Sequence, residues 1–478
     1  MRYNGTVIIL FIIGRQFVLK HFFALKRPTP LGLGVTKERQ LWFKEFIKAF
    51  MVVFLVYFCM YLIRNNLSAA QPLLVQQNGI STTALGWIGY GFSLAYGIGK
   101  TVLGYVVDGK NTKRFMSFLL MLGALMTLII GILFLMDKAP VGLILVLWSL
   151  NGLFQSPGGS ASLSTISRWT TTTSRGKYIG IWNISHELGG AVAGIIALWG
   201  ANHLFAGHVG GMFIFPAIIG LLVGCWGLFF GADDPKELGW DASEVIFDEK
   251  IPEADLAAST MSKWTIFKTF VMKSPWVWLL CIANVFVYVV RIGIVNWAPL
   301  YTVQQLHFTI AQGANTLLLF QLGGILGSVV WGWFSDVLKG RRAVVSIICL
   351  ILTAFVVLGY RYGTTPLMIN TALFGLGMLI YGPQLLIGVS VISFVPKTAL
   401  NVSDGLTGTF AYIFGDLMAQ VGFAAIADPK KNGLMIFGHL LHGWQDTFIV
   451  FYIAVILSIL VLAIVAIGEE KRIKAQFD

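Results

Sequence analysis

The chain has 478 residues, of which 56% are hydrophobic and 12% are charged, with a formal net charge of +12. Soluble globular domains have about 25% charged residues, so this composition excludes a soluble globular protein. Apolar runs of roughly 18 to 25 residues recur along most of the length, and runs of that size indicate membrane-spanning helices. We therefore predict an all-α polytopic membrane protein.

The first region, residues 1–43, holds the apolar run TVIILFII, which is too short to span a bilayer. We expect residues 1–43 to form a cytoplasmic or interfacial extension. The hydropathy pattern then predicts six spans in residues 44–231 and six in residues 273–468. Their expected bounds are near 45–66, 84–107, 114–136, 141–165, 177–202, 211–231, 274–301, 314–336, 343–361, 366–394, 402–427 and 445–467.

The segment between the two sets of spans, residues 232–272, is acidic, polar and contains proline. We predict a central cytoplasmic loop there and a cytoplasmic tail at 469–478. Lysines and arginines cluster in loops expected on the same side, whereas loops such as LSAAQPLLVQQNGIS contain none. By the positive-inside rule both termini are predicted to be cytoplasmic. The positive charge is thus explained by topology, and no nucleic-acid partner is expected.

Two arginines lie inside apolar spans, each three residues after a tyrosine. Tyr61 and Arg64 are in the first span and Tyr288 and Arg291 in the seventh, so the arginines are 291 − 64 = 227 positions apart. A guanidinium at the centre of a spanning helix costs about 2.5 to 3.5 kcal/mol. A chain that carries this cost at matched positions is expected to hold an anion between its halves.

A second motif repeats with nearly the same offset. GYVVDGKNTKR contains Asp108 and GWFSDVLKGRR contains Asp336, and these acids are 336 − 108 = 228 positions apart. The two offsets predict a duplicated chain of two six-helix halves, which is the major facilitator architecture. Glycine at this place permits close helix approach, and the acid can meet basic residues or a helix N-terminus. We expect a gating motif of Gly104, Asp108, Arg114, Gly332, Asp336, Arg341 and Arg342.

Further ionisable residues in the spans share a helix face with an aromatic residue. Pairs three or four positions apart on a helix are neighbours, so a cavity lined by such pairs would suit a phosphorylated, hydroxyl-rich solute. The pairs are Tyr96 with Lys100, Trp182 with His186, and Tyr412 with Asp416. Tyr57 lies four positions before Tyr61 and extends the helix face of Tyr61 and Arg64.

For these residues a structural role is the alternative. Lys100 can extend toward the membrane surface, His186 can be an interior histidine with ordinary partners, and each tyrosine can be a packing residue. Glu187 projects about 100° away from His186 and is expected to face another helix. Asp416 can be a counter-ion for the cationic site or a specificity element.

The chain resembles the organophosphate:phosphate antiporters of the major facilitator superfamily, and among them the hexose-phosphate transporters. The resemblance covers most of residues 45–470 and rests on segments such as YLIRNN, RGKYIGIWNISHELGGA, VYVVRIGI and GTFAYIFGD. It implies that Arg64 and Arg291 bind the phosphate group. The other site positions that it implies are Lys100, Trp182, His186, Tyr57, Tyr61, Tyr96, Tyr288, Tyr381 and Tyr412.

The chain also departs from its relatives. Glycerol-phosphate relatives have a second cation directly after the first-helix arginine, where this chain has Asn65. Hexose-phosphate relatives have a lysine one turn after Asp416, where this chain has Gln420, and an acid of the eighth helix is Gln321 here. These changes leave the arginine pair intact and bear on the choice of the organic group.

The resemblance implies a secondary transporter of the plasma membrane that exchanges a sugar phosphate for inorganic phosphate without a cofactor, and acts as a monomer. Glycerol 3-phosphate as the substrate, or a non-transporting hexose-phosphate sensor, are the alternatives. We expect no enzyme, because the sequence shows no nucleophile–base or metal constellation.

Overall fold

The computed structural model describes residues 22–107, 109–249, 265, 267–391, 394–395, 400–436 and 438–477. The run TVIILFII and Asp108 lie outside the described residues. The N-terminal half contains the helices α2 (Val35–Asn78), α3 (Thr82–Val107), α4 (Thr112–Leu135), α5 (Val141–Gln155), α6 (Gly158–Trp169), α7 (Thr172–Leu204) and α8 (Gly211–Phe229).

Short elements follow in the central segment: η1 (Pro235–Leu238), α9 (Ser243–Ile246) and η2 (Phe267–Val271). The C-terminal half repeats the pattern of long helices. It contains α12 (Pro275–Gln305), α13 (Ile310–Val337), α14 (Arg342–Tyr362), α15 (Pro366–Ser390), α16 (Leu400–Phe410), η5 (Ala411–Gly415), η6 (Leu417–Gly422), α17 (Phe423–Ala427) and α18 (Trp444–Phe477).

Eleven candidate membrane spans of the described residues meet the requirements of length and hydropathy, with α5–α6 and α16–α17 each counted as one. Helix α3 has 26 residues but is not among them. Lys100, Tyr90 and Tyr96 lower its hydropathy, and these residues lie against the opposite half of the bundle rather than lipid. With α3 included, the described residues account for the twelve predicted spans.

Three spans differ in detail from the sequence prediction. Helix α2 begins at Val35, inside the region predicted as an extension, because residues 35–44 continue the helix with a polar surface. The predicted span 141–165 is divided at Pro157, which cannot supply an interior helical hydrogen bond. The span 402–427 contains the π-helical segments η5 and η6 on either side of Asp416. Such π segments occur mainly at functional sites.

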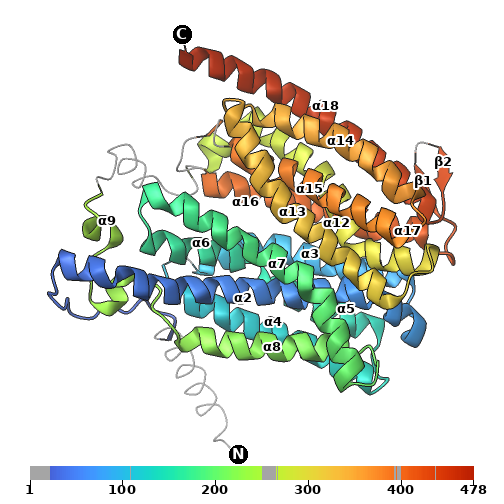
Figure 1. The fold of residues 1–478 in the computed structure, drawn as a ribbon, viewed down its shortest axis with the longest axis horizontal. Helices are drawn as coiled ribbons and strands as arrows, with labels where there is room; N and C mark the ends of the chain where they lie inside the picture. The colour runs from blue at the N-terminus through green and yellow to red at the C-terminus, as the bar shows by residue number, and fades with distance from the viewer. Residues whose placement is uncertain are drawn as a thin grey trace, which may run out of the picture.

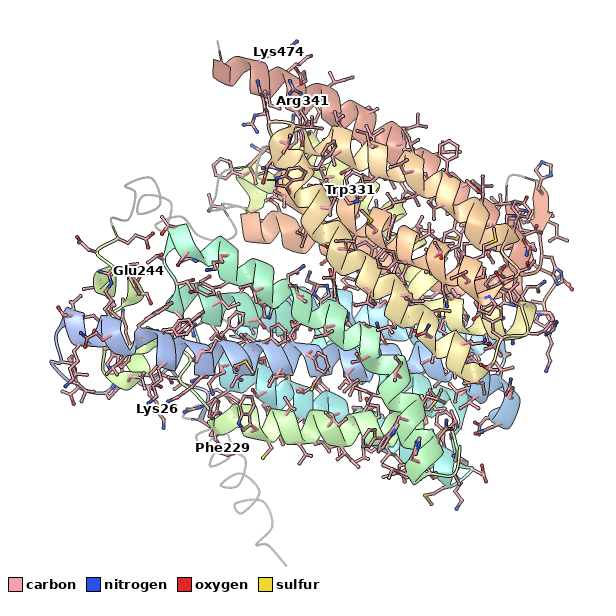
Figure 2. The ribbon with its side chains drawn as sticks, in the orientation of Figure 1. Lys26, Phe229, Glu244, Trp331, Arg341 and Lys474 are labelled. Atoms are coloured by element: carbon pink, nitrogen blue, oxygen red, sulfur yellow. The ribbon has the colours of Figure 1, made fainter. Side chains whose placement is uncertain are left out.

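The two ends of the bundle are distinguished by their short elements (Figure 1). The strands β1 (Leu434–Ile436) and β2 (His439–Leu441) pair antiparallel, Leu434 with Leu441, at one end, which we call the hairpin end. The other end, which we call the terminal end, carries residues 22–34, α9 and the end of α18. Figure 2 shows Lys26, Glu244, Arg341 and Lys474 toward this end.

Packing inside each half follows the same scheme. In the N-terminal half α2 packs on α7, α3 on α5 and α4 on α8; in the C-terminal half α12 packs on α16 and η5, α13 on α15 and α14 on α18. Between the halves, α2 lies against α12, α7 against α13, and α3 against η5, η6 and α17. The interface between the halves is therefore built from equivalent helices of the two repeats.

Each half connects its last helix to the N-terminus of its third helix through a buried acid. Asp233 accepts hydrogen bonds from the backbone N–H groups of Thr112 and Lys113 at 3.0 Å and pairs with Arg168. In the other half, Glu469 accepts from the N–H of Ala343 at 2.8 Å. A carboxylate is favourable at a helix N-terminus because it satisfies free N–H groups and the helix dipole. The sequence predicted an acid of the gating motif, Asp108 or Asp336, for a contact of this kind.

Hydrogen bonds between the halves occur mainly on the hairpin side of the bundle centre. Asp428, after α17, accepts from the backbone N–H and hydroxyl of Thr83 at 3.0 and 2.6 Å. Tyr90 donates to the carbonyl of Ile413 at 3.2 Å. The contact of Thr83 with Asp428 joins the first turn of α3 to the end of the eleventh span, so the halves are connected at the hairpin end.

Candidate substrate-binding site

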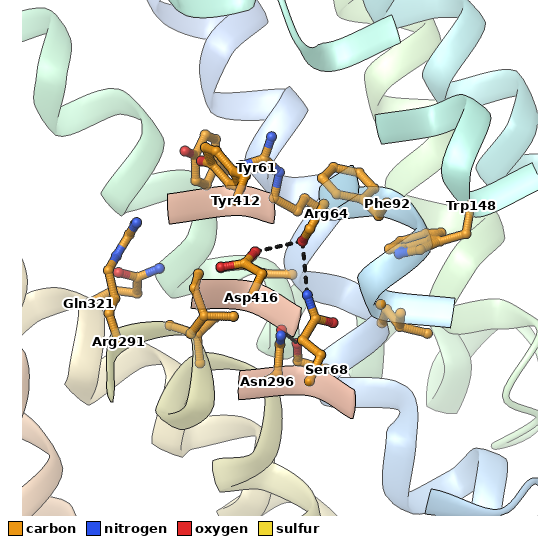
Figure 3. Close-up of a pocket in the computed structure, with 17 residues that line it drawn as sticks. Tyr61, Arg64, Ser68, Phe92, Trp148, Arg291, Asn296, Gln321, Tyr412 and Asp416 are labelled. Carbon is orange, nitrogen blue, oxygen red and sulfur yellow. Dashed lines mark hydrogen bonds between the residues drawn. The ribbon is translucent and has the colours of Figure 1, made fainter. Parts of the chain in front are cut away.

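A cavity of about 50 Å³ lies between the halves near the centre of the bundle (Figure 3). Residues from both halves line it, and both in-register arginines are among them. The lining residues are Tyr61, Arg64, Asn65, Leu67, Ser68, Gly89, Phe92, Ser93, Trp148, Arg291, Ile292, Val295, Asn296, Gln321, Tyr412, Asp416 and Gln420.

Arg64 of α2 is half-buried and surrounded by aromatic rings. Its guanidinium carbon lies 4.4 Å from the ring centroid of Tyr61, 4.7 Å from that of Phe92 and 4.3 Å from that of Tyr96. Nε donates a hydrogen bond of 3.3 Å to Gln155 Oε1. Ring faces stabilise a cation without neutralising it, so the positive charge of Arg64 remains available to an anion.

Arg291 of α12 is more deeply buried, with 4% of its surface exposed. Nη2 donates to the hydroxyl of Tyr381 at 3.2 Å, and that hydroxyl also hydrogen-bonds Gln321. The rings of Tyr288 and Tyr381 lie 5.5 and 4.7 Å from its guanidinium carbon. Arg291 is therefore oriented by a hydrogen-bonded chain within its own half, and no described acid forms an ion pair with it.

The remaining predicted aromatic residues form two clusters beside the arginines. Tyr57 stacks on Trp182 with ring centroids 4.7 Å apart, and His186 lies 4.9 Å from the ring of Tyr61. On the other side, the ring of Tyr412 lies 4.6 Å from that of Tyr96 and 5.3 Å from that of Tyr288. Tyrosines from both halves thus meet at the cavity.

Lys100 does not line the cavity. It lies one turn beyond Tyr96 toward the terminal end, and its Nζ is 2.8 Å from the position that a Cβ atom at Gly408 would occupy. This places the ammonium group against α16, between Tyr96 and the terminal end. Lys100 therefore borders the approach to the cavity from that end.

The gating-motif residues lie away from the cavity, at the terminal end. Asp336 is exposed, and Arg341 pairs with Glu470 through Nε at 2.8 Å. A Cβ atom at Gly332 would meet only Leu385 Cδ2 at 3.7 Å, so no close helix approach depends on this glycine here. Gly104 belongs to α3, Arg114 Nη1 donates to the carbonyl of Phe22, and Arg342 Nη1 donates to that of Val389.

Asp416, in the π-helical region, has its partner in the opposite half. Its Oδ2 accepts from Ser93 Oγ at 2.6 Å, and Gln420 Nε2 donates to the same Ser93 oxygen at 2.8 Å. No hydrogen bond from the described residues reaches the buried Oδ1. Gln420, at the position where the resemblance implies a lysine, thus joins Asp416 in a hydrogen-bonded bridge to Ser93 of α3.

Glu187 faces the opposite half, as its angular offset from His186 predicted. Its Oε1 accepts from Ser328 Oγ of α13 at 3.3 Å. Nearby, a Cβ atom at Gly190 would lie 2.5 Å from Gln321 Nε2 and 2.6 Å from Asn65 Nδ2. Gly190 of α7 therefore leaves space for two amide side chains at the interface between the halves.

Several cavity residues were not found by sequence reasoning. Ser68 lies four residues after Arg64 and so extends its helix face, and Ser93 lies three residues before Tyr96. Asn296 gave no comparable signal, nor did Gln155, which lies outside the lining and bonds Arg64, because uncharged polar residues are common in spanning helices. Among the described residues, no group of three or more potential metal ligands occurs.

The Major Facilitator Superfamily profile matches residues 53–426. The hexose-6-phosphate:phosphate antiporter of Escherichia coli (strain K12) is 46% identical over 95% of this chain and 96% of its own length. The chain belongs to the organophosphate:phosphate antiporter family of the major facilitator superfamily. It is a transporter and not an enzyme.

Other similar proteins agree with this assignment. The hexose-6-phosphate:phosphate antiporter of Salmonella typhimurium is 44% identical over 95% of this chain and 96% of its own length. The glycerol-3-phosphate transporter of Haemophilus influenzae is 31% identical over 89% and 92%. Among solved structures, a bacterial homologue of the human lysosomal transporter Spinster has a TM-score of 0.65 at 14% identity, covering 89% of this chain and 97% of its own. This structural similarity shows that the chain has the same fold as that transporter.

Proposed function

We propose that the protein imports a hexose 6-phosphate in exchange for inorganic phosphate, by alternating access of one central site. Arg64 and Arg291 bind the phosphate group common to both substrates. The other predicted site residues, Lys100, Trp182, His186 and the six tyrosines, surround the arginines or border the approach to them.

The observation that carries the proposal is that two arginines from equivalent helices of the two halves line one cavity, without an ion-paired acid among the described residues. The relatives that exchange hexose 6-phosphate for phosphate are 44% and 46% identical to the chain. A planar guanidinium binds two phosphate oxygens at once, and two such groups can hold a dianion.

The arginine pair also explains why transport is an exchange. Closing an empty site around two cations requires their desolvation without a counter-charge, which costs several kcal/mol per ion. Bound phosphate removes that penalty, so the loaded protein changes orientation much faster than the empty one. Movement of one phosphate compound is then coupled to the return of another.

We assign the terminal end to the cytoplasm of a bacterial cell. Basic residues are concentrated there, as the positive-inside rule requires of a cytoplasmic face, although Lys430 and Lys431 lie in the loop of the hairpin end. With this orientation, the hydrogen bonds between the halves close the site toward the outside. The basic residues at the terminal end include Lys110, Arg168, Lys339, Arg341, Arg342 and Lys474.

Transport is tested with the full-length protein in proteoliposomes loaded with inorganic phosphate. Radiolabelled phosphate, glucose 6-phosphate and glycerol 3-phosphate are each supplied outside. We expect exchange of phosphate and of glucose 6-phosphate, with the hexose phosphate preferred over glycerol 3-phosphate. Uptake into liposomes without internal phosphate should be close to background.

Two results would overturn parts of this proposal. A preference for glycerol 3-phosphate would reject the hexose assignment while leaving phosphate exchange intact. Absence of any exchange, together with saturable binding of glucose 6-phosphate to the purified protein, would favour the sensor alternative.

A further inference from the structure

The cavity has a polar floor on the hairpin side of the arginines, which consists of Ser68, Ser93, Asn296, Asp416 and Gln420. Ser68 is one turn beyond Arg64 in α2, and Asn296 is five residues beyond Arg291 in α12. Figure 3 shows Asp416 between the level of Tyr61 and Tyr412 and the level of Ser68 and Asn296. The floor therefore lies on the hairpin side of the place proposed for the phosphate group.

Two polar atoms of this floor, one in Asp416 and one in Asn296, form no hydrogen bond with the described residues. Asp416 is 1% exposed; Ser93 occupies its Oδ2, whereas Oδ1 accepts no hydrogen bond. Asn296 accepts from Ser68 Oγ at 3.2 Å through Oδ1, and no hydrogen bond is formed by its amide nitrogen within the described chain. The floor thus offers one free acceptor and one free donor to the cavity.

These groups suit hydroxyls rather than a second phosphate. A buried polar atom without a hydrogen bond costs about 1 to 3 kcal/mol, so a ligand that satisfies it gains affinity. A hydroxyl group both donates and accepts hydrogen bonds and can satisfy a carboxylate oxygen and an amide. A phosphate dianion next to the Asp416 carboxylate would be repelled. The arginines and the floor therefore select chemically different parts of one molecule.

We propose that the floor binds hydroxyl groups of the transported phosphate ester, with Asp416 Oδ1 accepting from one hydroxyl and the Asn296 amide donating to another. The proposal rests on the proposed function, in which the arginines hold the phosphate. Inorganic phosphate does not extend to the floor. Asn296 and Asp416 are thus specificity-determining residues for the ester, and the hydrogen bonds of Ser68 and Ser93 orient them.

The test uses the ratio of two KM values, for glucose 6-phosphate and for inorganic phosphate, in proteoliposomes loaded with phosphate. In Asn296→Ala the ratio should increase about threefold to tenfold, the worth of one neutral hydrogen bond. In Asp416→Asn it should increase more, since a hydrogen bond to a charged group is stronger. The control Gln304→Ala removes another amide of α12 that lies outside the cavity, where it accepts from Trp444 Nε1 at 3.1 Å, so the ratio should remain close to wild type.

Deoxy analogues of glucose 6-phosphate complete the test. At least one analogue should bind more weakly than glucose 6-phosphate to the wild type but equally well to Asn296→Ala, because the hydroxyl and its donor are then both absent. An unchanged KM ratio in Asn296→Ala, the same shift in Gln304→Ala, or a uniform response to every analogue would overturn the proposal.

The wild-type measurement separates this inference from the proposed function. If the wild type carries glycerol 3-phosphate and no hexose phosphate, the hexose assignment fails. The same ratio is then measured with glycerol 3-phosphate, whose hydroxyls the floor would bind. An increase in Asn296→Ala would still support the floor, and an unchanged ratio would reject it.

Discussion

Arg64 and Arg291 occupy equivalent positions in the two halves, yet they are held differently. Arg64 is half-buried among ring faces and donates a hydrogen bond of 3.3 Å to Gln155. Arg291 is almost fully buried and oriented by Tyr381, which in turn bonds Gln321. One arginine is thus free to adjust to a ligand, and the other is fixed in advance. A site of this kind combines a rigid reference point with an adaptable partner, which suits two substrates of different size.

The largest expected effect on phosphate exchange comes from replacing each of the two arginines with lysine. Lysine keeps the charge but loses the planar pair of donors, so we expect phosphate exchange to fall by about 100-fold or more in both variants, as for the loss of a buried charged hydrogen bond of about 3 kcal/mol. The measurement is phosphate–phosphate exchange at equal amounts of reconstituted protein. The exposed Arg472 provides the control Arg472→Lys, which should exchange normally. Full activity of Arg64→Lys or Arg291→Lys would reject the arginine pair as the phosphate site.

The supports of the two arginines should differ in importance. Tyr381→Phe removes the hydroxyl that links Arg291 to Gln321, and exchange should fall about tenfold because two hydrogen bonds are lost. Gln155→Leu removes the 3.3 Å bond to Arg64 and should cost only about threefold. Initial rates of phosphate exchange check both variants. Equal losses would show that Arg291 is no more dependent on its support than Arg64.

The amide cluster next to Arg291 gives a smaller effect. Gly190→Ala would place a Cβ atom against the side-chain ends of Gln321 and Asn65, so Gln321 must move and its bond to Tyr381 must weaken. We expect a twofold to fivefold decrease in exchange, about 0.5 to 1 kcal/mol. Gly332→Ala meets only an ordinary contact and is the matched control. A larger loss in Gly332→Ala would instead show that the gating motif closes tightly in another conformation.

Asp428 offers the smallest effect, at a place remote from both arginines. Burial alone would raise the pKa of this carboxyl, but hydrogen bonds from Thr83 and from the backbone of Lys430 outweigh burial and lower the pKa below its usual value. Closure of the hairpin end is therefore stabilised at neutral pH and weakens as pH falls through the lowered pKa. Asp428→Asn should change exchange by about twofold or less at pH 7, because the asparagine oxygen can still accept the hydrogen bonds of Thr83. The pH profile of exchange below the ordinary aspartate pKa of 3.8 should flatten in this variant; an unaltered profile would contradict the assignment.

Much of the fold follows from sequence because hydropathy and repeated landmarks are local signals. The spans, the duplication and the approach of Arg64 to Arg291 could all be predicted, since each needs only helix periodicity and matched offsets. Tyr57, Tyr61 and Arg64 share one helix face for the same reason. These residues depend little on contacts far away in the chain.

Other features depend on tertiary contacts and could not be predicted. The bridge from Asp416 to Ser93 joins residues 323 positions apart, and nothing in either segment indicates the other. The π-helical turns around Asp416 have no sequence signal as clear as proline at the division between α5 and α6. Lys100 was expected in the cavity because it shares a face with Tyr96, but the last α3 residue of the lining is Ser93, about two helical turns earlier.

The acids Asp233 and Glu469 have a consequence for how the chain can be divided. Each acid binds the N-terminus of the third helix of its own half, so each half closes its own terminal end without help from the other. Contacts such as Ser93–Asp416 and Thr83–Asp428 come only from association. Two polypeptides separated within the central segment should therefore fold individually and assemble into one carrier when they are produced together.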